Sequence, residues 1–361
     1  MVPYPTLPVP ERITLLRTEL FSTANSICYE RALIVTRSYH DTEGEHWALR
    51  RAKALYAVLT EMPLLIREGE LLVGQRAARL GARSLYPEYH LWGLTPDNTP
   101  ADIWDYWHGR TLGDEVQRAM PEPLLRARKE LAAGFVTSES TGFGHVIVDY
   151  PKALREGFNA IISQARQLLV ETPSDDIEGQ AFLQAVIIAG EGLILFAQRY
   201  ASFAEQQAAE CADPVRAAEL HRIATICQRV PAEPACDLYE ALQSFWLVQI
   251  ALHLEQYGWS ISAGHFDQYM LLYYRADLTS GRLTREDAWE LLLSLWVKFM
   301  ENVGSDLRTT IFQNITLGGQ DEQGRDLSNE LSSLCLDATI ALRFNQPALT
   351  VRWHPGITPA F

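Results

Sequence analysis

Helical periodicity is the feature that most constrains what this chain can fold into. From Leu154 onward, apolar residues fall at positions 154, 158, 161, 162, 165, 168 and 169, which is one face of a helix with a repeat of about 3.6 residues. A second start signal stands at Thr284, with Asp287 three residues later, before apolar residues that again share one face. We expect further helices near 10–24, 45–62, 121–133, 178–210, 214–229 and 237–257.

Strand candidates are few and short. They are 70–75, 145–149, 313–318 and 347–353. The third alternates apolar and polar residues and then reaches the pair Gly318 and Gly319, which signals a turn. Residues 94–101 form a Pro-rich connector. Long helices between sparse strands predict an α/β architecture in which helices predominate.

Composition excludes several classes of partner. The chain has 31 Lys and Arg against 45 Asp and Glu, a net charge of −14, and this acidic balance disfavours nucleic acid and anionic membrane surfaces. The first residues have no basic region followed by an apolar run, so we expect no signal peptide. The apolar stretch 181–197 is too short to span a bilayer and predicts a buried helix. We therefore expect a cytoplasmic protein.

Cysteine and histidine patterns argue against disulfides and metals. The five cysteines, at 28, 211, 227, 236 and 335, are unevenly spaced and contain no Cys-x-x-Cys pair, as expected for free thiols in a reducing compartment. The nine histidines form no His-Glu-x-x-His motif and no Cys/His cluster. No metal site is indicated.

Two segments resemble known motifs, but each lacks a glycine that its motif requires. The run Gly142, Phe143, Gly144 resembles a dinucleotide-binding loop, but Ile147 replaces its third glycine and the loop precedes a strand where it should follow one. Gly258, Trp259 and Ser260 begin like a nucleophile elbow, but Ser262 replaces the final glycine and the stretch follows a helix. Neither a nucleotide-binding protein nor a serine hydrolase is favoured.

Seven segments in order carry a resemblance to a known family. They are 28–32 (Cys-Tyr-Glu-Arg-Ala), 70–75 (Glu-Leu-Leu-Val-Gly-Gln), 86–89 (Tyr-Pro-Glu-Tyr), 144–151 (Gly-His-Val-Ile-Val-Asp-Tyr-Pro), 264–269 (Gly-His-Phe-Asp-Gln-Tyr), 295–298 (Leu-Trp-Val-Lys) and 346–352 (Gln-Pro-Ala-Leu-Thr-Val-Arg). Together they resemble the N-terminal part of a glycyl radical enzyme of the pyruvate formate-lyase-like group, on its dehydratase and lyase branch. The resemblance implies an incomplete, predominantly helical part of that family's ten-stranded α/β barrel.

The resemblance also implies what this chain cannot do alone. Complete members carry a Gly-Cys-x-Glu loop and a C-terminal Arg-Val-x-Gly-Tyr loop, and neither string occurs in these 361 residues. Residues 1–361 would be a single N-terminal portion of the domain that supplies pocket walls for a small polar metabolite, is inactive by itself and binds no cofactor. The family's glycine radical is installed by an activating enzyme that uses S-adenosylmethionine and an iron–sulfur cluster.

Two kinds of function follow as alternatives. One is an enzyme fragment that works with a complementary C-terminal chain, and the other is a non-catalytic remnant or binding subunit that pairs with a chain carrying the Cys and Gly loops. In both cases we expect self-association, because part of a barrel leaves strand edges and its interior uncovered.

The resemblance nominates Phe143, His145, Trp259 and Ser260 as substrate-binding residues. His145 matches a histidine that contacts a substrate hydroxyl and can act as an acid, although a structural histidine bonded to backbone is the alternative. Ser260 matches a serine that helps to hold a hydroxyl. Trp259 stands where several members have histidine, and His265 where arginine is common, which disfavours glycerol as substrate or indicates catalytic decay.

Two further charged residues are expected to be structural. Asp267 opens a helix, where a carboxylate interacts favourably with the helix dipole. Arg352 ends a strand and could be a surface charge, an ion-pair partner or a carboxylate anchor, with a structural role favoured.

Overall fold

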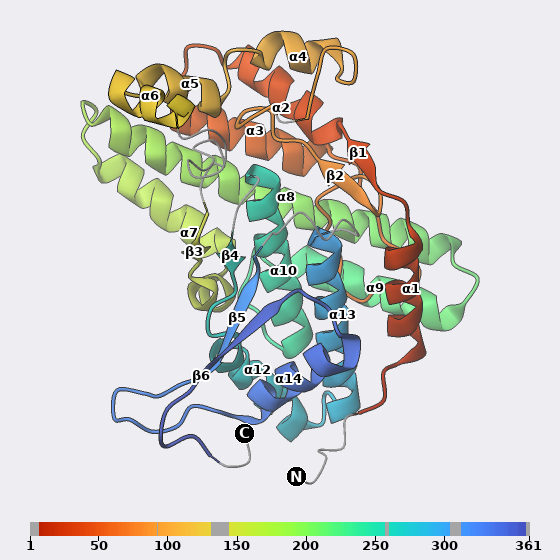
Figure 1. The fold of residues 1–361 in the computed structure, drawn as a ribbon. Helices are drawn as coiled ribbons and strands as arrows, with labels where there is room; N and C mark the ends of the chain where they lie inside the picture. Colours follow the sequence, from red (N-terminus) through yellow and green to blue (C-terminus); the bar gives the residue numbers. More distant parts are fainter. Residues whose placement is uncertain (1–6, 92, 131–143, 257–259, 304–311, 359–361) are drawn as a thin grey trace.

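Helices make up most of this computed structural model, which describes residues 7–91, 93–130, 144–256, 260–303 and 312–358. The prediction of an α/β protein in which helices predominate is confirmed (Figure 1). The helices in chain order are α1 (Glu11–Ser22), α2 (Glu30–Asp41), α3 (Trp47–Glu61), α4 (Ala101–Trp107), α5 (Leu112–Ala119), α6 (Glu122–Glu130), α7 (Tyr150–Glu171), α8 (Ile177–Glu210), α9 (Pro214–Arg229), α10 (Leu238–Glu255), α11 (Phe266–Tyr269), α12 (Leu271–Ser280), α13 (Arg285–Val303) and α14 (Glu330–Leu342).

The strands are short and their pairings are parallel. They are β1 (Ser26–Cys28), β2 (Ala82–Ser84), β3 (Val146–Ile147), β4 (Ile261–Ser262), β5 (Asn314–Gly318) and β6 (Ala348–Arg352). β1 pairs with β2, β3 with β4 and β5 with β6. A parallel bridge between Gly264 and Ile315 joins β4 to β5. Four strands therefore follow one another side by side in the order β3, β4, β5, β6.

The core lies around α10 and α13, which run side by side through the centre of the molecule (Figure 1). Nearly every residue of α10 is buried, and Trp246 and Trp296 are each at most 1% exposed. Phe299 contacts both indoles edge-on, at ring-centroid distances of 5.4 and 6.2 Å. This aromatic cluster holds the two helices together and gives the strands a rigid apolar support.

A second helical layer is built by α8, against which α3, α7 and α9 each pack. Among the described residues, α8 alone is long and apolar enough to cross a membrane by length and composition, with 33% of its most apolar window buried. A core helix of a soluble protein meets the same criterion, and α8 lies packed between α3, α7 and α9. The predicted helix over this stretch is confirmed.

The predicted strand at 70–75 is wrong. These residues form an irregular segment whose backbone groups are bonded by side chains of α10. Gln243 donates from Nε2 to the carbonyl oxygen of Val73 at 2.8 Å and accepts from the Val73 amide at 2.9 Å, and Trp246 donates to the carbonyl oxygen of Gly74 at 2.9 Å. Helix side chains thus satisfy the bonds that a neighbouring strand would make, so the apolar run needs no sheet.

Candidate functional site

The strands β4, β5 and β6 present one face to the helical core and the other away from it. Ile261, Ile315 and Leu317 are fully buried on the core face. Because side chains alternate along a strand, Asn314 and Thr316 point to the opposite face. There the amide of Asn314 donates from Nδ2 to Oγ1 of Thr350 at 2.8 Å, across to β6. This opposite face, called the polar strand face below, carries hydroxyl and amide groups outside the core.

The structure brings His145 and Ser260 together across β3 and β4. The Val146 amide donates to the Ser260 carbonyl oxygen at 3.1 Å, and the parallel register that pairs Val146 with Ile261 places His145 opposite Ser260. The side chain of His145 is exposed and that of Ser260 is half-buried. Phe143 and Trp259 lie outside the described residues.

Both residues have unusual backbone conformations. The φ angle is 55° at His145 and 61° at Ser260, in the left-handed region that residues other than glycine rarely adopt. Such positions cost roughly 1–3 kcal/mol each and concentrate at functional sites. The Ser260 hydroxyl lies 3.4 Å from that of Ser262, so two hydroxyls lie close together at the start of β4.

One glutamine of α10 fixes both strands. Gln249 accepts from the Tyr150 hydroxyl, which begins α7 directly after β3, and donates from Nε2 to the carbonyl oxygen of Ile261 in β4 at 2.9 Å. Its Nε2 also lies 3.2 Å from Nε2 of His253. Burial, followed by the nearby Arg76 charge, lowers the pKa of His253 to about 3, so its imidazole is neutral. The sequence pattern does not single out Gln249, which is one of several buried polar residues of α10.

Asp267 is structural, as expected, but it does more than begin α11. It is fully buried, and its Oδ2 accepts from the Gly318 amide at 2.8 Å and from the Ser332 hydroxyl. It therefore ties the end of β5 to the start of α14. Burial raises the pKa of this carboxyl. His265 precedes α11 as its N-cap residue, and its side chain makes no capping bond.

Two buried ion-pair clusters join segments that carry the family resemblance. In the first, Arg31 pairs with Glu88, lies 3.8 Å from the Tyr86 ring centroid and donates to the carbonyl oxygens of Leu254 and Glu255 at the end of α10. It joins segments 28–32 and 86–89 directly before the loop that leads to Ser260.

In the second cluster, Lys298 of α13 pairs with Glu70 at 3.0 Å and with Glu301 at 2.7 Å, and Arg67 contacts both carboxylates. Lys298 and Glu70 are at most 2% exposed. Although burial alone would raise it, the pKa of Glu70 is lowered, because Lys298 and Arg67 stabilise the carboxylate. Segments 70–75 and 295–298 meet at this cluster.

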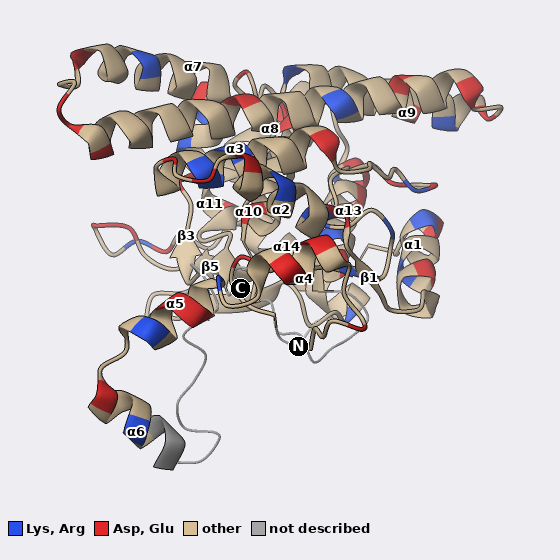
Figure 2. Ribbon diagram, turned by 90° about the horizontal axis from the view of Figure 1, so that it is seen from above, with Lys and Arg blue, Asp and Glu red and all other residues tan. Residues whose placement is uncertain are grey.

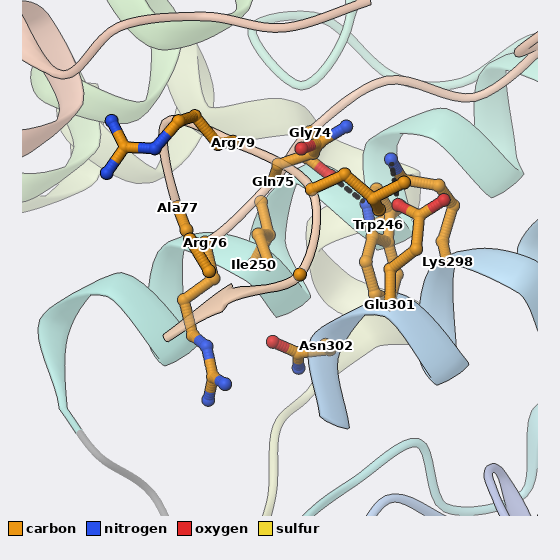
Figure 3. A pocket seen from close by; sticks show the side chains of 13 residues that line it. Gly74, Gln75, Arg76, Ala77, Arg79, Trp246, Ile250, Lys298, Glu301 and Asn302 are labelled. Atoms are coloured by element: carbon orange, nitrogen blue, oxygen red, sulfur yellow. Dashed lines mark hydrogen bonds and ion pairs between the residues drawn. The ribbon is translucent and has the colours of Figure 1, made fainter. Parts of the chain in front are cut away.

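A small cavity lies beside the second cluster (Figure 3). It is lined by the segment from Gly74 to Ala82 together with Trp246, Ile250, Lys298 and Asn302, and its volume is about 20 Å³. This is room for one water molecule, whereas small-molecule sites usually measure about 300–1,000 Å³. The cavity is therefore no substrate site.

Metal-binding groups do not gather in the part of the chain that the structure describes, where no three His, Cys, Asp or Glu residues lie close enough to hold an ion. All five cysteines are free thiols, as expected. Arg352 is exposed at the end of β6 and makes no ion pair with a described residue. A Cβ on Gly319 would lie 3.2 Å from its Nη1, so the guanidinium packs along that glycine.

Comparison with known proteins confirms the resemblance. A family model described as "Pyruvate formate lyase-like" matches residues 6–361. The isethionate sulfite-lyase of Desulfovibrio desulfuricans is 34% identical over 90% of this chain and 44% of its own length. The trans-4-hydroxy-L-proline dehydratase of Clostridioides difficile is 28% identical over 95% of this chain and 47% of its own length.

Solved structures of glycyl radical enzymes match this fold as well. The glycerol-bound B12-independent glycerol dehydratase from Clostridium butyricum matches with a TM-score of 0.89 and 32% identity, over 99% of this chain and 49% of that protein. A glycyl radical enzyme from Archaeoglobus fulgidus matches with a TM-score of 0.87. The chain spans about half the length of the relatives it matches. Its architecture is therefore that of part of a glycyl radical enzyme barrel.

Proposed function

Because this chain belongs to the pyruvate formate lyase-like family, we propose that it forms the N-terminal wall of a substrate cavity in a glycyl radical dehydratase or lyase. The observation that carries this proposal is the pairing of β3 with β4, which places the imidazole-bearing His145 opposite Ser260. The substrate class is a small polar metabolite with at least one hydroxyl or comparable leaving group. When installed, the family's glycine radical would supply, through the cysteine of the Gly-Cys-x-Glu loop, homolytic cleavage of a substrate C–H bond.

The residues of this chain would bind and orient that substrate. Ser260 and Ser262 offer hydroxyls that can accept from or donate to a substrate hydroxyl. His145 is exposed directly before β3, and its imidazole can donate a proton to a departing hydroxyl. Phe143 and Trp259 are proposed to flank the pair as apolar walls, so that few polar groups select the orientation, as in most small-molecule sites.

The cysteines of this chain do not suit the radical relay. None stands in Gly-Cys-x-Glu, and Cys28, Cys227 and Cys335 are buried, which raises the pKa of each thiol. We propose that a complementary C-terminal polypeptide supplies the Cys and Gly loops, and that residues 1–361 form a single portion of the shared domain in the cytoplasm. An activating enzyme with S-adenosylmethionine and an iron–sulfur cluster would then install the radical on that polypeptide.

The test is reconstitution. The chain is incubated anaerobically with the activating enzyme and S-adenosylmethionine, alone and together with the polypeptide encoded directly downstream, and electron paramagnetic resonance spectra are recorded. A glycine-type doublet is expected only when both polypeptides are present. A doublet from this chain alone would refute the proposal. A downstream sequence without either loop motif would instead identify a non-catalytic remnant or binding subunit.

A further inference from the structure

A cavity lined by both charged and aromatic residues lies away from the polar strand face. It has a volume of about 550 Å³ and is bounded by α2 and α3 on one side and by α4 and α5 on the other. These helices cluster at one end of the molecule (Figure 1), and α5 leads away from the body (Figure 2). The cavity falls within the usual size range of small-molecule sites.

Its aromatic wall is rigid. The ring of Trp107 contacts those of Tyr39 and Tyr106 edge-on, with centroid distances of 5.1 and 5.0 Å. The Trp107 indole also donates to Oγ1 of Thr36 at 2.8 Å, which fixes its orientation. Burial, followed by the charge of Glu88, raises the pKa of Tyr39, so its phenol stays neutral and does not repel an anion.

Most charges around the cavity are neutralised in pairs. Arg110 lies 3.1 Å from Glu43, and Arg51 pairs with Glu255. Glu88, another carboxylate that lines the cavity, pairs with Arg31. The remaining charges on α5, Glu115 and Arg118, are exposed at its outer rim. These groups therefore contribute little net charge inside the cavity.

Arg50 differs from these residues. Its Nη2 donates only to uncharged oxygens, the Tyr39 carbonyl at 2.7 Å and the Tyr106 hydroxyl at 3.1 Å, and its guanidinium lies 4.7 Å from the Tyr39 ring centroid. Its Nε is buried and reaches no acceptor among the described residues, and no described carboxylate pairs with it. A positioned cation that no described carboxylate neutralises, in a cavity lined by aromatic rings, is a site for an anion.

We propose that this cavity binds a small aromatic carboxylate, with the carboxylate on Arg50 and the ring against the Tyr39, Tyr106 and Trp107 wall. A monoanion matches one unpaired guanidinium, and a planar ring matches the edge-on aromatic cluster. The site shares no residue with β3 or β4, so it is separate from the proposed substrate site.

Calorimetric titration of the 361-residue chain with benzoate, benzyl alcohol and acetate tests this proposal. Saturable binding of benzoate is expected, with the neutral alcohol and the ring-free acetate each binding at least about tenfold more weakly. Equal affinity for benzoate and benzyl alcohol, or no saturable binding of benzoate, would overturn the proposal without any variant.

Variants of Arg50 then test whether this residue binds the carboxylate. Arg50→Gln is expected to weaken benzoate at least about tenfold, and Arg50→Lys to bind with intermediate affinity because it keeps the charge but loses the planar fork. Arg37→Gln, an exposed arginine of the neighbouring helix that pairs with Glu61, is the matched control and should bind like the unaltered chain. Unchanged affinity in a folded Arg50→Gln variant, as judged by circular dichroism, would refute the role of Arg50.

Discussion

The amide of Val146 donates a 3.1 Å hydrogen bond to the carbonyl oxygen of Ser260. This single backbone contact joins two segments that are far apart in the chain and makes His145 a neighbour of Ser260. Both residues hold left-handed backbone conformations at the points where β3 and β4 begin. Two strained residues side by side require support from the surrounding structure, and that support comes from the buried polar groups of α10.

The first prediction concerns Gln249, which bonds to groups beside both strands. Gln249→Leu would leave the buried Tyr150 hydroxyl and the Ile261 carbonyl without their partner, so the free energy of unfolding should fall by about 2–4 kcal/mol. Urea denaturation measures the change. Gln228→Leu, at an exposed position of α9, is the control and should change stability by less than about 0.5 kcal/mol. Equal stabilities for the two variants would show that Gln249 does not support the strands.

The second prediction concerns the buried cluster around Lys298. Glu70→Gln removes one carboxylate and leaves Lys298 and Arg67 with an excess of buried positive charge, so it should cost about 3–5 kcal/mol in unfolding free energy. Glu61→Gln breaks the exposed pair with Arg37 and should cost less than about 1 kcal/mol. The comparison is made by denaturation at neutral pH, and a small loss in Glu70→Gln would mean that the cluster is not a stabilising element.

How far the sequence could predict this fold depends on where each segment finds its hydrogen bonds. The helical repeat of apolar residues predicted α7 and α13. β5 and β6 were predicted because their residue pattern or their flanking residues were distinctive. The 70–75 segment misled the prediction because Gln243 and Trp246, distant in sequence, take the place of a strand partner. β1, β2 and β4 were missed because two or three residues are too few to show an alternating pattern.

The candidate site was less accessible than the fold. No periodicity brings His145 to Ser260, so only the family resemblance could suggest that they meet. The supporting role of Gln249 depends on contacts with two other elements that no local pattern contains. Arg50 was missed for a related reason, since an arginine in an ordinary amphipathic helix is distinguished only by which acceptors the fold gives it.

The third prediction is a pH dependence to which two histidines contribute, the half-buried His90, whose pKa burial lowers to about 4, and the fully buried His253. The pKa of His253 falls from 6.5 to about 3 on folding, so between these values the unfolded chain binds a proton that the folded chain does not. Stability should therefore be fully present above about pH 6.5 and decrease as the pH falls, by up to about 1.4 kcal/mol per pH unit for each histidine.

Thermal denaturation at about pH 7.5 and about pH 5.5 checks this dependence, because few carboxylates titrate in that window. His253→Gln should lose less stability between the two conditions than the unaltered chain. His221→Gln, at an exposed histidine of α9, should keep the original pH response. A His253→Gln variant with the same response as the unaltered chain would assign the effect to other groups.

The last prediction concerns the edge of the strand ladder. In the described residues β6 pairs only with β5, and Val351 and Trp353 near this edge are 39% and 75% exposed. An unpaired parallel edge with exposed apolar side chains favours self-association. Light scattering of the chain should therefore give a mass above that of a monomer, and replacing both residues with lysine should lower it, because charges at an edge oppose strand pairing. Val170→Lys, at a position that is 87% exposed on α7, adds a charge to an apolar surface elsewhere and should leave the mass unchanged. A monomeric unaltered chain, or an equal effect of the Val170 variant, would rule out the β6 edge as the surface of association.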